Sequence, residues 1–270
     1  MFRKLVKYVL IIACLVVFFY VNNNWLTVSN HTIHSSEIPT SFDGYRIVQV
    51  SDLHDATFGA NQQRLVKKIQ QTKPDTIVIT GDIIDSNRYN LQNSLDLIDQ
   101  IVKIADVYYV TGNHEVATND VDRIKEELTD RGVRVLSNET LKLERAGEAI
   151  SLTGIEDPLM GEVASQMIAD SRVPSDAFTV LLAHRPEDFQ AYVDAGIDVT
   201  FSGHAHGGQF RIPGMGGLVA PGQGYFPKYT AGIHEQGQKK LVVSRGLGNS
   251  IIPMRLFNLP EIVVVTLKSN

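Results

Sequence analysis

Three β-rich runs recur at a nearly constant interval, and each ends in a polar side chain. "YRIVQVSD" (45–52), "DTIVITGD" (75–82) and "DVYYVTGN" (106–113) end at Asp52, Asp82 and Asn113, which are 30 and then 31 residues apart. That interval is about the length of one β-α unit. Because the strands of such units are parallel, we expect the three ends to meet at one edge of a sheet.

The segments between these runs have a helical pattern. Apolar side chains recur at helical spacing over 65–69 and over 91–102. The first half of the folded region is therefore predicted to be a right-handed β-α-β-α-β series.

The second half continues with further strands. "FTVLLAHRP" (178–186) predicts a strand that ends at His184, a short helix follows over 186–195, and "GIDVTFSGH" (196–204) predicts a strand that ends at His204. We also expect a hairpin over 139–157 with its turn at Gly147, and a final strand over 262–270. This mixture predicts an α/β fold of two packed sheets with helices outside, in one domain over 25–270.

Oxygen and imidazole side chains gather at these strand ends. They are Asp52, His54, Asp82, Asn113, His114, His184, His204 and His206, and they include five of the eight histidines. Each one alone is explained as a cap or a surface residue. The set is not, because Asp52 and Asp82 would repel each other at one sheet edge without a cation.

The residue types indicate which metals this site would take. Carboxylates, a carboxamide and imidazoles without a thiolate suit zinc, manganese or iron. Seven ligands are more than one catalytic metal needs, whereas two metals that share a carboxylate use them all. The glycines of "TFSGHAHGGQFRIPG" (200–214) would let the backbone approach such a pair closely.

Five blocks resemble the calcineurin-like metallophosphoesterase family, in that family's order and over residues 52–206. The blocks are "DLH" (52–54), "GDIID" (81–85), "GNHE" (112–115), the lone His184 and "GHAH" (203–206). The tail "SRGLGNSIIPMRLFNLPEI" (244–262) resembles the membrane-anchored bacterial branch, which is associated with phosphodiesters and with hydrolysis of UDP-2,3-diacylglucosamine-type lipids.

This resemblance implies a four-layer α/β-β/α sandwich, the metallo-dependent phosphatase fold, with two divalent ions. The implied ligands are Asp52, His54 and His206 for one ion, Asn113, His184 and His204 for the other, and Asp82 as the bridge. The implied nucleophile is a metal-bridging hydroxide. His114 would face the leaving oxygen as a general acid or charge stabiliser, and Asp85 would hydrogen-bond His114. Ser86 stands where the family's protein phosphatases have an arginine, which weakens the interpretation of this chain as a phosphoprotein phosphatase.

The expected reaction is therefore hydrolysis of a phosphodiester or pyrophosphate, on a lipid-linked or nucleotide-sugar substrate. Arg245 and Arg255 are candidate phosphate contacts, although structural ion pairs would explain them as well. Tyr225, Phe226 and Tyr229 would rest on lipid if they are exposed and form core if they are packed. The alternatives to an enzyme are a metal-binding pseudoenzyme that acts as a sensor or scaffold, and a structural membrane protein.

The N-terminal segment, residues 1–24, predicts a membrane anchor. Arg3, Lys4 and Lys7 flank an apolar run over 8–21, and residues 5–21 are long enough to span a bilayer if Lys7 snorkels. A cleaved signal peptide and a lipoprotein modified at Cys14 are the alternatives. With the positive flank inside, we expect a single-pass protein of the cell membrane whose domain is extracytoplasmic. The net charge of −5 gives no signal for nucleic-acid binding.

Overall fold

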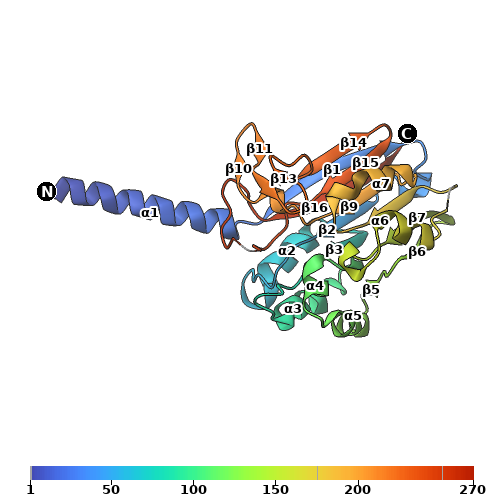
Figure 1. Cartoon of the computed structure of the whole chain (residues 1–270), viewed down its shortest axis with the longest axis horizontal. Helices are drawn as coiled ribbons and strands as arrows, with labels where there is room; N and C mark the ends of the chain where they lie inside the picture. The colour runs from blue at the N-terminus through green and yellow to red at the C-terminus, as the bar shows by residue number, and fades with distance from the viewer. Residues whose placement is uncertain (1, 175, 251) are drawn as a thin grey trace.

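Two six-stranded sheets pack face to face and carry helices on their outer surfaces (Figure 1). The computed structural model describes residues 2–174, 176–250 and 252–270. This arrangement confirms the predicted four-layer α/β-β/α sandwich.

The first sheet contains the parallel series that the spacing predicts. β2, β3, β4 and β5 run parallel, β16 is antiparallel to β2, and β1 at the edge is parallel to β16. In spatial order the strands are β1 (Thr27–Ser35), β16 (Glu261–Ser269), β2 (Arg46–Val50), β3 (Thr76–Thr80), β4 (Asp106–Val110) and β5 (Arg134–Val135).

The second sheet is mixed. β15, β9, β8 and β7 run parallel, and the antiparallel edge strands β14 and β6 flank them. In spatial order the strands are β14 (Gly232–Gln236), β15 (Lys239–Val243), β9 (Val199–Ser202), β8 (Thr179–Leu182), β7 (Glu148–Gly154) and β6 (Glu139–Arg145).

Three apolar layers hold the sandwich together. The central layer lies between the sheets, because alternate strand residues point inward, as Val180 and Leu182 of β8 do. The first sheet's outer face is covered by α2 (Gln63–Gln71), α3 (Leu91–Ile101) and α5 (Val121–Asp130). The second sheet's outer face is covered by α6 (Ala164–Asp170) and α7 (Phe189–Asp194).

The remaining short elements lie in the connections. α4 (Asn113–Ala117) follows β4 directly. The 3-10 turns are η1 (Thr40–Phe42), η2 (Ala60–Gln62), η3 (Pro158–Met160), η4 (Pro186–Asp188) and η5 (His206–Gly208). Two small hairpins pair β10 (Arg211–Ile212) with β11 (Gly216–Gly217) and β12 (Val219–Ala220) with β13 (Gly224–Tyr225).

The predicted strands, helices and 139–157 hairpin are confirmed, but β1 is an addition. "TVSNHTIHS" has few large apolar side chains, so its pattern indicates no buried strand. It becomes a strand because it pairs with β16 over nine residues, from Thr27 with Glu261 to Ser35 with Ser269. Tertiary pairing here overrides a weak local pattern.

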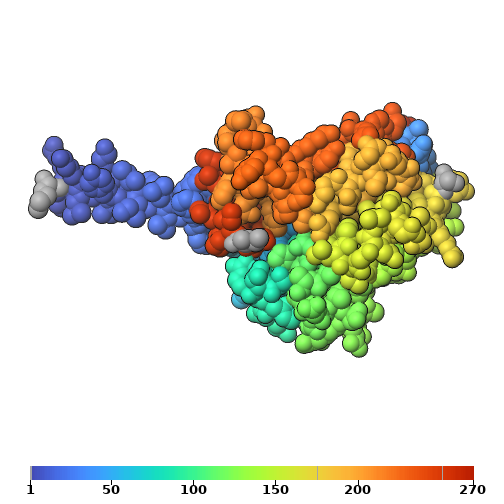
Figure 2. Space-filling view, in the orientation of Figure 1, coloured from blue at the N-terminus to red at the C-terminus, as the bar shows by residue number. Residues whose placement is uncertain are grey.

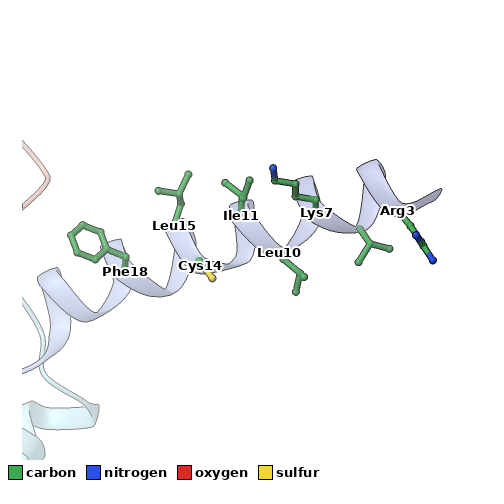
Figure 3. A pocket seen from close by; sticks show the side chains of 8 residues that line it. Arg3, Lys7, Leu10, Ile11, Cys14, Leu15 and Phe18 are labelled. Atoms are coloured by element: carbon green, nitrogen blue, oxygen red, sulfur yellow. The ribbon is translucent and has the colours of Figure 1, made fainter. Parts of the chain in front are cut away.

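Helix α1 (Phe2–Asn24) projects away from the sandwich (Figures 1 and 2). It has 23 residues, its most apolar 18-residue stretch has a mean hydropathy of 2.3, and it is long and apolar enough to cross a membrane. The charged side chains Arg3 and Lys7 stand near its outer end, and apolar side chains such as Leu10 and Leu15 follow toward the domain (Figure 3).

Candidate metal centre

The polar strand ends of both sheets come together at one edge of the sandwich. The predicted ligands lie at or just after a carboxyl end: Asp52 and His54 after β2, Asp82 after β3, Asn113 after β4, His184 after β8, and His204 and His206 after β9. The buried Gln49 side chain joins the sheets near this edge, since it donates to Thr80 Oγ1 at 2.8 Å and to the Ser202 carbonyl at 2.9 Å.

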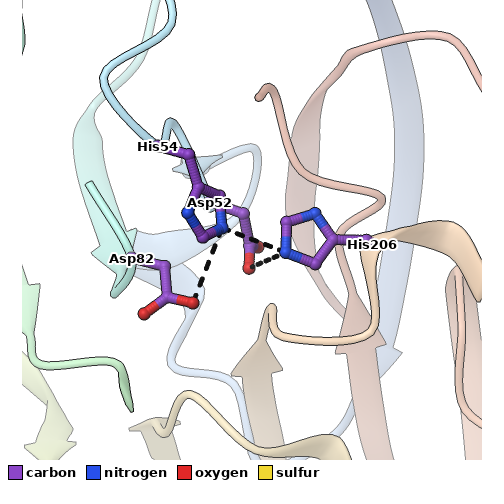
Figure 4. A group of neighbouring side chains, drawn as sticks. All are labelled: Asp52, His54, Asp82 and His206. Carbon is purple, nitrogen blue, oxygen red and sulfur yellow. Dashed lines mark hydrogen bonds and ion pairs between the residues drawn. The ribbon is translucent and has the colours of Figure 1, made fainter. Parts of the chain in front are cut away.

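A first group consists of Asp52, His54, Asp82 and His206, all buried (Figure 4). His54 Nε2 lies 3.0 Å from His206 Nε2 and 3.6 Å from Asp82 Oδ2. His206 Nε2 lies 3.5 Å from Asp52 Oδ1. One ligand atom from each residue lies within 4.8 Å of all the others, so one cation could contact all four side chains.

A second group shares Asp82 with the first and adds His184 and His204. His184 Nε2 lies 3.2 Å from Asp82 Oδ2, 3.2 Å from Asn113 Oδ1 and 3.2 Å from His204 Nδ1. Only Asp82 belongs to both groups, which is the position that a bridging carboxylate requires.

The donor atoms fit metal ions better than they fit one another. Asp52 Oδ2 is buried and has no hydrogen-bond partner among the described residues. Buried polar atoms are normally paired, so this group needs an additional partner. The His54 and His206 Nε2 atoms face each other at 3.0 Å, a distance that suits either one N–H···N bond or a cation that both nitrogens bind.

Electrostatics lead to the same conclusion. Burial raises the pKa of Asp52 to about 6. Burial also opposes ionisation of Asp82, but His184 and His54 together hold its pKa well below the usual range. In turn, Asp82 outweighs the burial of His184 and raises its pKa to about 10. In the metal-free protein a proton on His184 therefore supplies positive charge that a divalent ion would otherwise bring.

The backbone at these strand ends is strained. Asp52, His54, Asp82, His204 and His206 have φ values of 51°, 47°, 51°, 63° and 46°, in the left-handed region that residues with a Cβ rarely adopt. Such outliers cluster at functional sites, where the surrounding structure enforces them.

Two glycines allow the backbone to lie close to the carboxylates of the site. A Cβ on Gly112 would lie 2.3 Å from Asp82 Oδ1, and a Cβ on Gly203 would lie 2.4 Å from Asp52 Oδ2. Any larger residue at either position would displace a carboxylate of the site.

Glu115, the last residue of the "GNHE" block, has a structural role that the motif alone did not indicate. Its buried carboxylate accepts backbone N–H bonds from Asp82 at 2.9 Å, Ile83 at 2.7 Å and Gly112 at 2.7 Å. Burial raises its pKa to about 7. Glu115 thereby joins the loop after β3 to the loop after β4, which fixes Asp82 relative to Asn113.

His114 lies beside the ligands, and its environment corrects one expectation. Its ring centroid is 4.5 Å from that of His54. Asp85 Oδ1 is 3.7 Å from His114 Nδ1, an ion-pair distance that exceeds a hydrogen bond. Nδ1 instead accepts the backbone N–H of Ser86 at 3.1 Å, while Arg88 Nε donates to Asp85 at 2.7 Å.

This contact has a consequence for the proton of His114. An N–H can only donate, so Nδ1 is an acceptor and the neutral ring carries its proton on Nε2. Nε2 faces Ser250 Oγ at 3.3 Å. Ser86, which stands where protein phosphatases have an arginine, therefore orients His114 in this chain.

The two candidate arginines are engaged within the fold. Arg245 donates to Glu261 at 2.9 Å and to Thr27 at 3.2 Å. Arg255 is 1% exposed, donates to the Arg245 carbonyl at 2.9 Å, and has a pKa that burial lowers to about 10. These contacts favour the structural alternative over phosphate binding, so neither arginine enters the site proposed below.

Comparisons with known proteins agree with this geometry. The calcineurin-like phosphoesterase family profile matches residues 45–208. The uncharacterized metallophosphoesterase YkuE of Bacillus subtilis (strain 168) is 34% identical over 257 residues, which cover 93% of this chain and 88% of that protein. Phosphodiesterase YaeI of Escherichia coli (strain K12) is 28% identical over 229 residues, which cover 83% and 82%.

A third relative is named as a transmembrane protein. A transmembrane protein with metallophosphoesterase domain from Danio rerio is 30% identical over 283 residues, which cover 99% of this chain but only 63% of that protein. The family match spans the strand ends from Asp52 to His206, where the polar groups converge. The chain belongs to the calcineurin-like phosphoesterase family and is a metal-dependent phosphoester hydrolase.

Proposed function

We propose that this protein hydrolyses phosphodiester or pyrophosphate bonds with two divalent ions held at the strand ends of both sheets. The observation that carries this proposal is the pair of buried groups that share Asp82. Asp52, His54 and His206 would hold one ion, Asn113, His184 and His204 would hold the other, and Asp82 would contact both. Manganese, iron and zinc all suit these donors.

The ions, when bound, would acidify water and neutralise charge on the phosphoryl oxygens. The chain's own residues do the positioning. His184 Nδ1 lies 2.6 Å from the Thr80 carbonyl, and His204 N–H donates to Asp52 Oδ1 at 2.9 Å. Both contacts fix the orientation of predicted ligands, as supporting hydrogen bonds do in known metal sites.

His114 would assist departure of the leaving oxygen. With Nδ1 accepting from Ser86, its proton resides on Nε2, the nitrogen available to a leaving alkoxide. The backbone N–H of His114 donates to Asp82 Oδ1 at 2.8 Å, which holds the residue at the edge of the centre without making it a ligand.

The substrate proposal is a phosphodiester or pyrophosphate at a membrane, either lipid-linked or a nucleotide sugar. The phosphodiesterase name of the E. coli relative supports the bond type. The resemblance of residues 244–262 to the branch that acts on UDP-2,3-diacylglucosamine-type lipids supports the lipid. Residues 1–24 would anchor the chain, and residues 25–270 would form the catalytic domain.

The hydrolase proposal is tested with bis-p-nitrophenyl phosphate and the full chain. We expect turnover in Mn²⁺, its loss in EDTA and its return when Mn²⁺ is restored. A chain that binds two ions without turning over any phosphodiester would instead be a metal-binding scaffold.

The orientation is tested on intact cells or spheroplasts. Because Arg3, Lys4 and Lys7 precede the apolar run, we expect externally added protease to digest the domain. Protection from protease would place the domain inside. A soluble chain that begins after Val21 would indicate a cleaved signal peptide.

A further inference from the structure

The end of the domain nearest α1 exposes apolar side chains from several loops. Met215 is 68% exposed, Tyr225 85%, Phe226 66% and Phe257 52%. They lie in the β10–β11 hairpin, in and beside the β12–β13 hairpin, and in the segment before β16. Figure 2 shows these orange and red segments gathered around the base of the blue helix. Large apolar patches on a monomer's surface usually mark an interaction site.

These loops are joined into one surface. The backbone N–H of Arg211 donates to the Leu256 carbonyl at 3.0 Å, and the N–H of Phe226 donates to the Leu218 carbonyl at 2.9 Å. Tyr229, from the same loop as Tyr225, instead packs on Phe189 with ring centroids 5.7 Å apart. The loop therefore divides its aromatic residues between the core and the exterior.

Specific contacts fix this surface to the end of α1. The Phe18 ring lies 5.3 Å from that of Phe257. Asn23 Oδ1 accepts from Asn249 Nδ2 at 2.9 Å and from the backbone N–H of Arg255 at 3.1 Å. If α1 crosses a bilayer, these contacts hold the apolar loops next to the membrane surface.

Cationic and aromatic side chains also lie at the base of the helix. Trp25, the only tryptophan, follows α1 directly, is 61% exposed and lies beside Arg64, Lys67 and Lys68. Arg64 also donates to the Asn24 carbonyl at 2.9 Å. Tryptophan prefers the headgroup level of a bilayer, and cations there attract anionic lipids.

From these observations we propose that the end of the domain around α1 is a lipid-docking surface, defined by Met215, Tyr225, Phe226 and Phe257 with the cationic edge at Lys67. The partner that binds this surface is the bilayer that α1 enters. Apolar side chains of interfacial elements reach about 5–10 Å into the headgroup and acyl boundary. This inference rests on the proposal that α1 is a membrane anchor.

Docking would bring the candidate active site to the lipid surface. Asn249 contacts α1, and the next residue, Ser250, lies 3.3 Å from His114 Nε2. Arg88, which pairs with Asp85, also donates to the Asn249 carbonyl at 3.0 Å. The substrate class that fits this placement is a phosphoester whose apolar part remains in the membrane.

The test uses the full chain in liposomes of phosphatidylcholine and phosphatidylglycerol with brominated acyl chains. A fluorophore is attached at the single native cysteine, Cys14, or at Met215→Cys, Tyr225→Cys or Glu144→Cys in a Cys14→Ser background. Glu144 is exposed on β6, at the opposite end of the domain from α1 (Figure 1). A far-ultraviolet circular dichroism spectrum that matches that of the unlabelled chain confirms that each variant is folded, and hydrolysis of bis-p-nitrophenyl phosphate is measured separately.

We expect lipid bromine to quench the labels at Cys14, Met215 and Tyr225 and to leave the Glu144 label bright. Quenching at Cys14 alone overturns the docking surface while the anchor stands. A bright label at Cys14 overturns both. A chain that docks but does not hydrolyse the phosphodiester retains this surface and loses the hydrolase proposal, so the two failures are distinguishable.

Discussion

The metal centre and the surface around α1 depart from an ordinary globular protein in opposite ways. The centre buries charged and polar side chains, and one of their atoms, Asp52 Oδ2, has no hydrogen-bond partner among the described residues. The surface exposes Tyr225 and Phe226, large aromatic side chains that a folded protein normally buries or places in an interaction site. In our proposals each region binds a partner from outside the chain: cations in one case and lipid in the other.

The difference also shows where structural constraint is concentrated. At the centre, residues with left-handed backbone are held in place by buried contacts such as those of Glu115. At the surface, exposed side chains have few neighbours. Single substitutions should therefore have large effects at the centre and small ones at the surface, and the following predictions test this contrast.

The largest effect is expected for Asp82→Ala. Because Asp82 alone belongs to both groups, its loss should release both ions and reduce hydrolysis to the level seen in EDTA. Metal content by atomic spectroscopy and hydrolysis of bis-p-nitrophenyl phosphate measure this. Asp122→Ala, at an exposed position of α5, is the control and should retain both ions. Full metal content in Asp82→Ala would contradict the bridging role.

The next largest effect is expected for His114→Gln. General acid–base assistance contributes about 10²–10⁴-fold, so we expect a rate loss of that order with two ions still bound. The loss should be greater for an alkoxide leaving group than for p-nitrophenolate, which needs little protonation. Steady-state rates for paired alkyl and p-nitrophenyl esters measure the difference.

Asp85→Asn is the comparison for His114→Gln. Because Asp85 lies 3.7 Å from His114 Nδ1 and does not hydrogen-bond it, Asp85→Asn should show the same leaving-group dependence more weakly, with a loss below the about 10–100-fold of a directly bonded supporting residue. Equal losses for both leaving groups in His114→Gln would reduce its role to charge stabilisation. Loss of an ion would make His114 a ligand.

A moderate effect is expected from pH on metal affinity. His184 has a pKa raised to about 10 and must lose its proton before it binds a metal, so affinity should rise with pH up to that value. One displaced proton corresponds to about tenfold per pH unit. Below pH 6 the slope should steepen, because Asp52, with a pKa of about 6, then also binds a proton. Mn²⁺ titration calorimetry in buffers of different ionisation enthalpy would count the protons, and an affinity that is constant from pH 6 to 9 would exclude this competition.

The smallest effect is expected for Lys67→Gln. A lysine near an anionic membrane surface is worth about 1 kcal/mol, which corresponds to about a fivefold change in the docking equilibrium. The docked fraction, read from quenching of the Tyr225→Cys label, should fall in vesicles with phosphatidylglycerol and stay unchanged in neutral ones. Lys142→Gln, on β6, is the control. An equal change for both substitutions would indicate a general charge effect rather than a cationic edge.

The fold and the polar residues that meet at the strand ends could be predicted from the sequence, but their supporting contacts could not. Regular spacing and apolar periodicity predicted β2, β3 and β4, and the polar residues that follow them are local features of the chain. β1 was missed because its pairing partner, β16, is more than 200 residues away. The hydrogen bond from the backbone N–H of Ser86 to His114 was missed for a similar reason. Every residue except proline has a backbone N–H, so the sequence does not indicate which acceptor that group will meet.

The sequence by itself determined which side chains end each strand, because strand periodicity and motif order are properties of consecutive residues. It also determined the apolar length of α1. Only the tertiary structure decided that the strand ends of two separate sheets face each other and that Arg245 and Arg255 make their hydrogen bonds within the fold. It also decided that Tyr225 and Phe226 are exposed while Tyr229 packs against Phe189. These outcomes depend on which distant residues compete for each polar atom and each apolar surface, and that competition is resolved only when the whole chain packs.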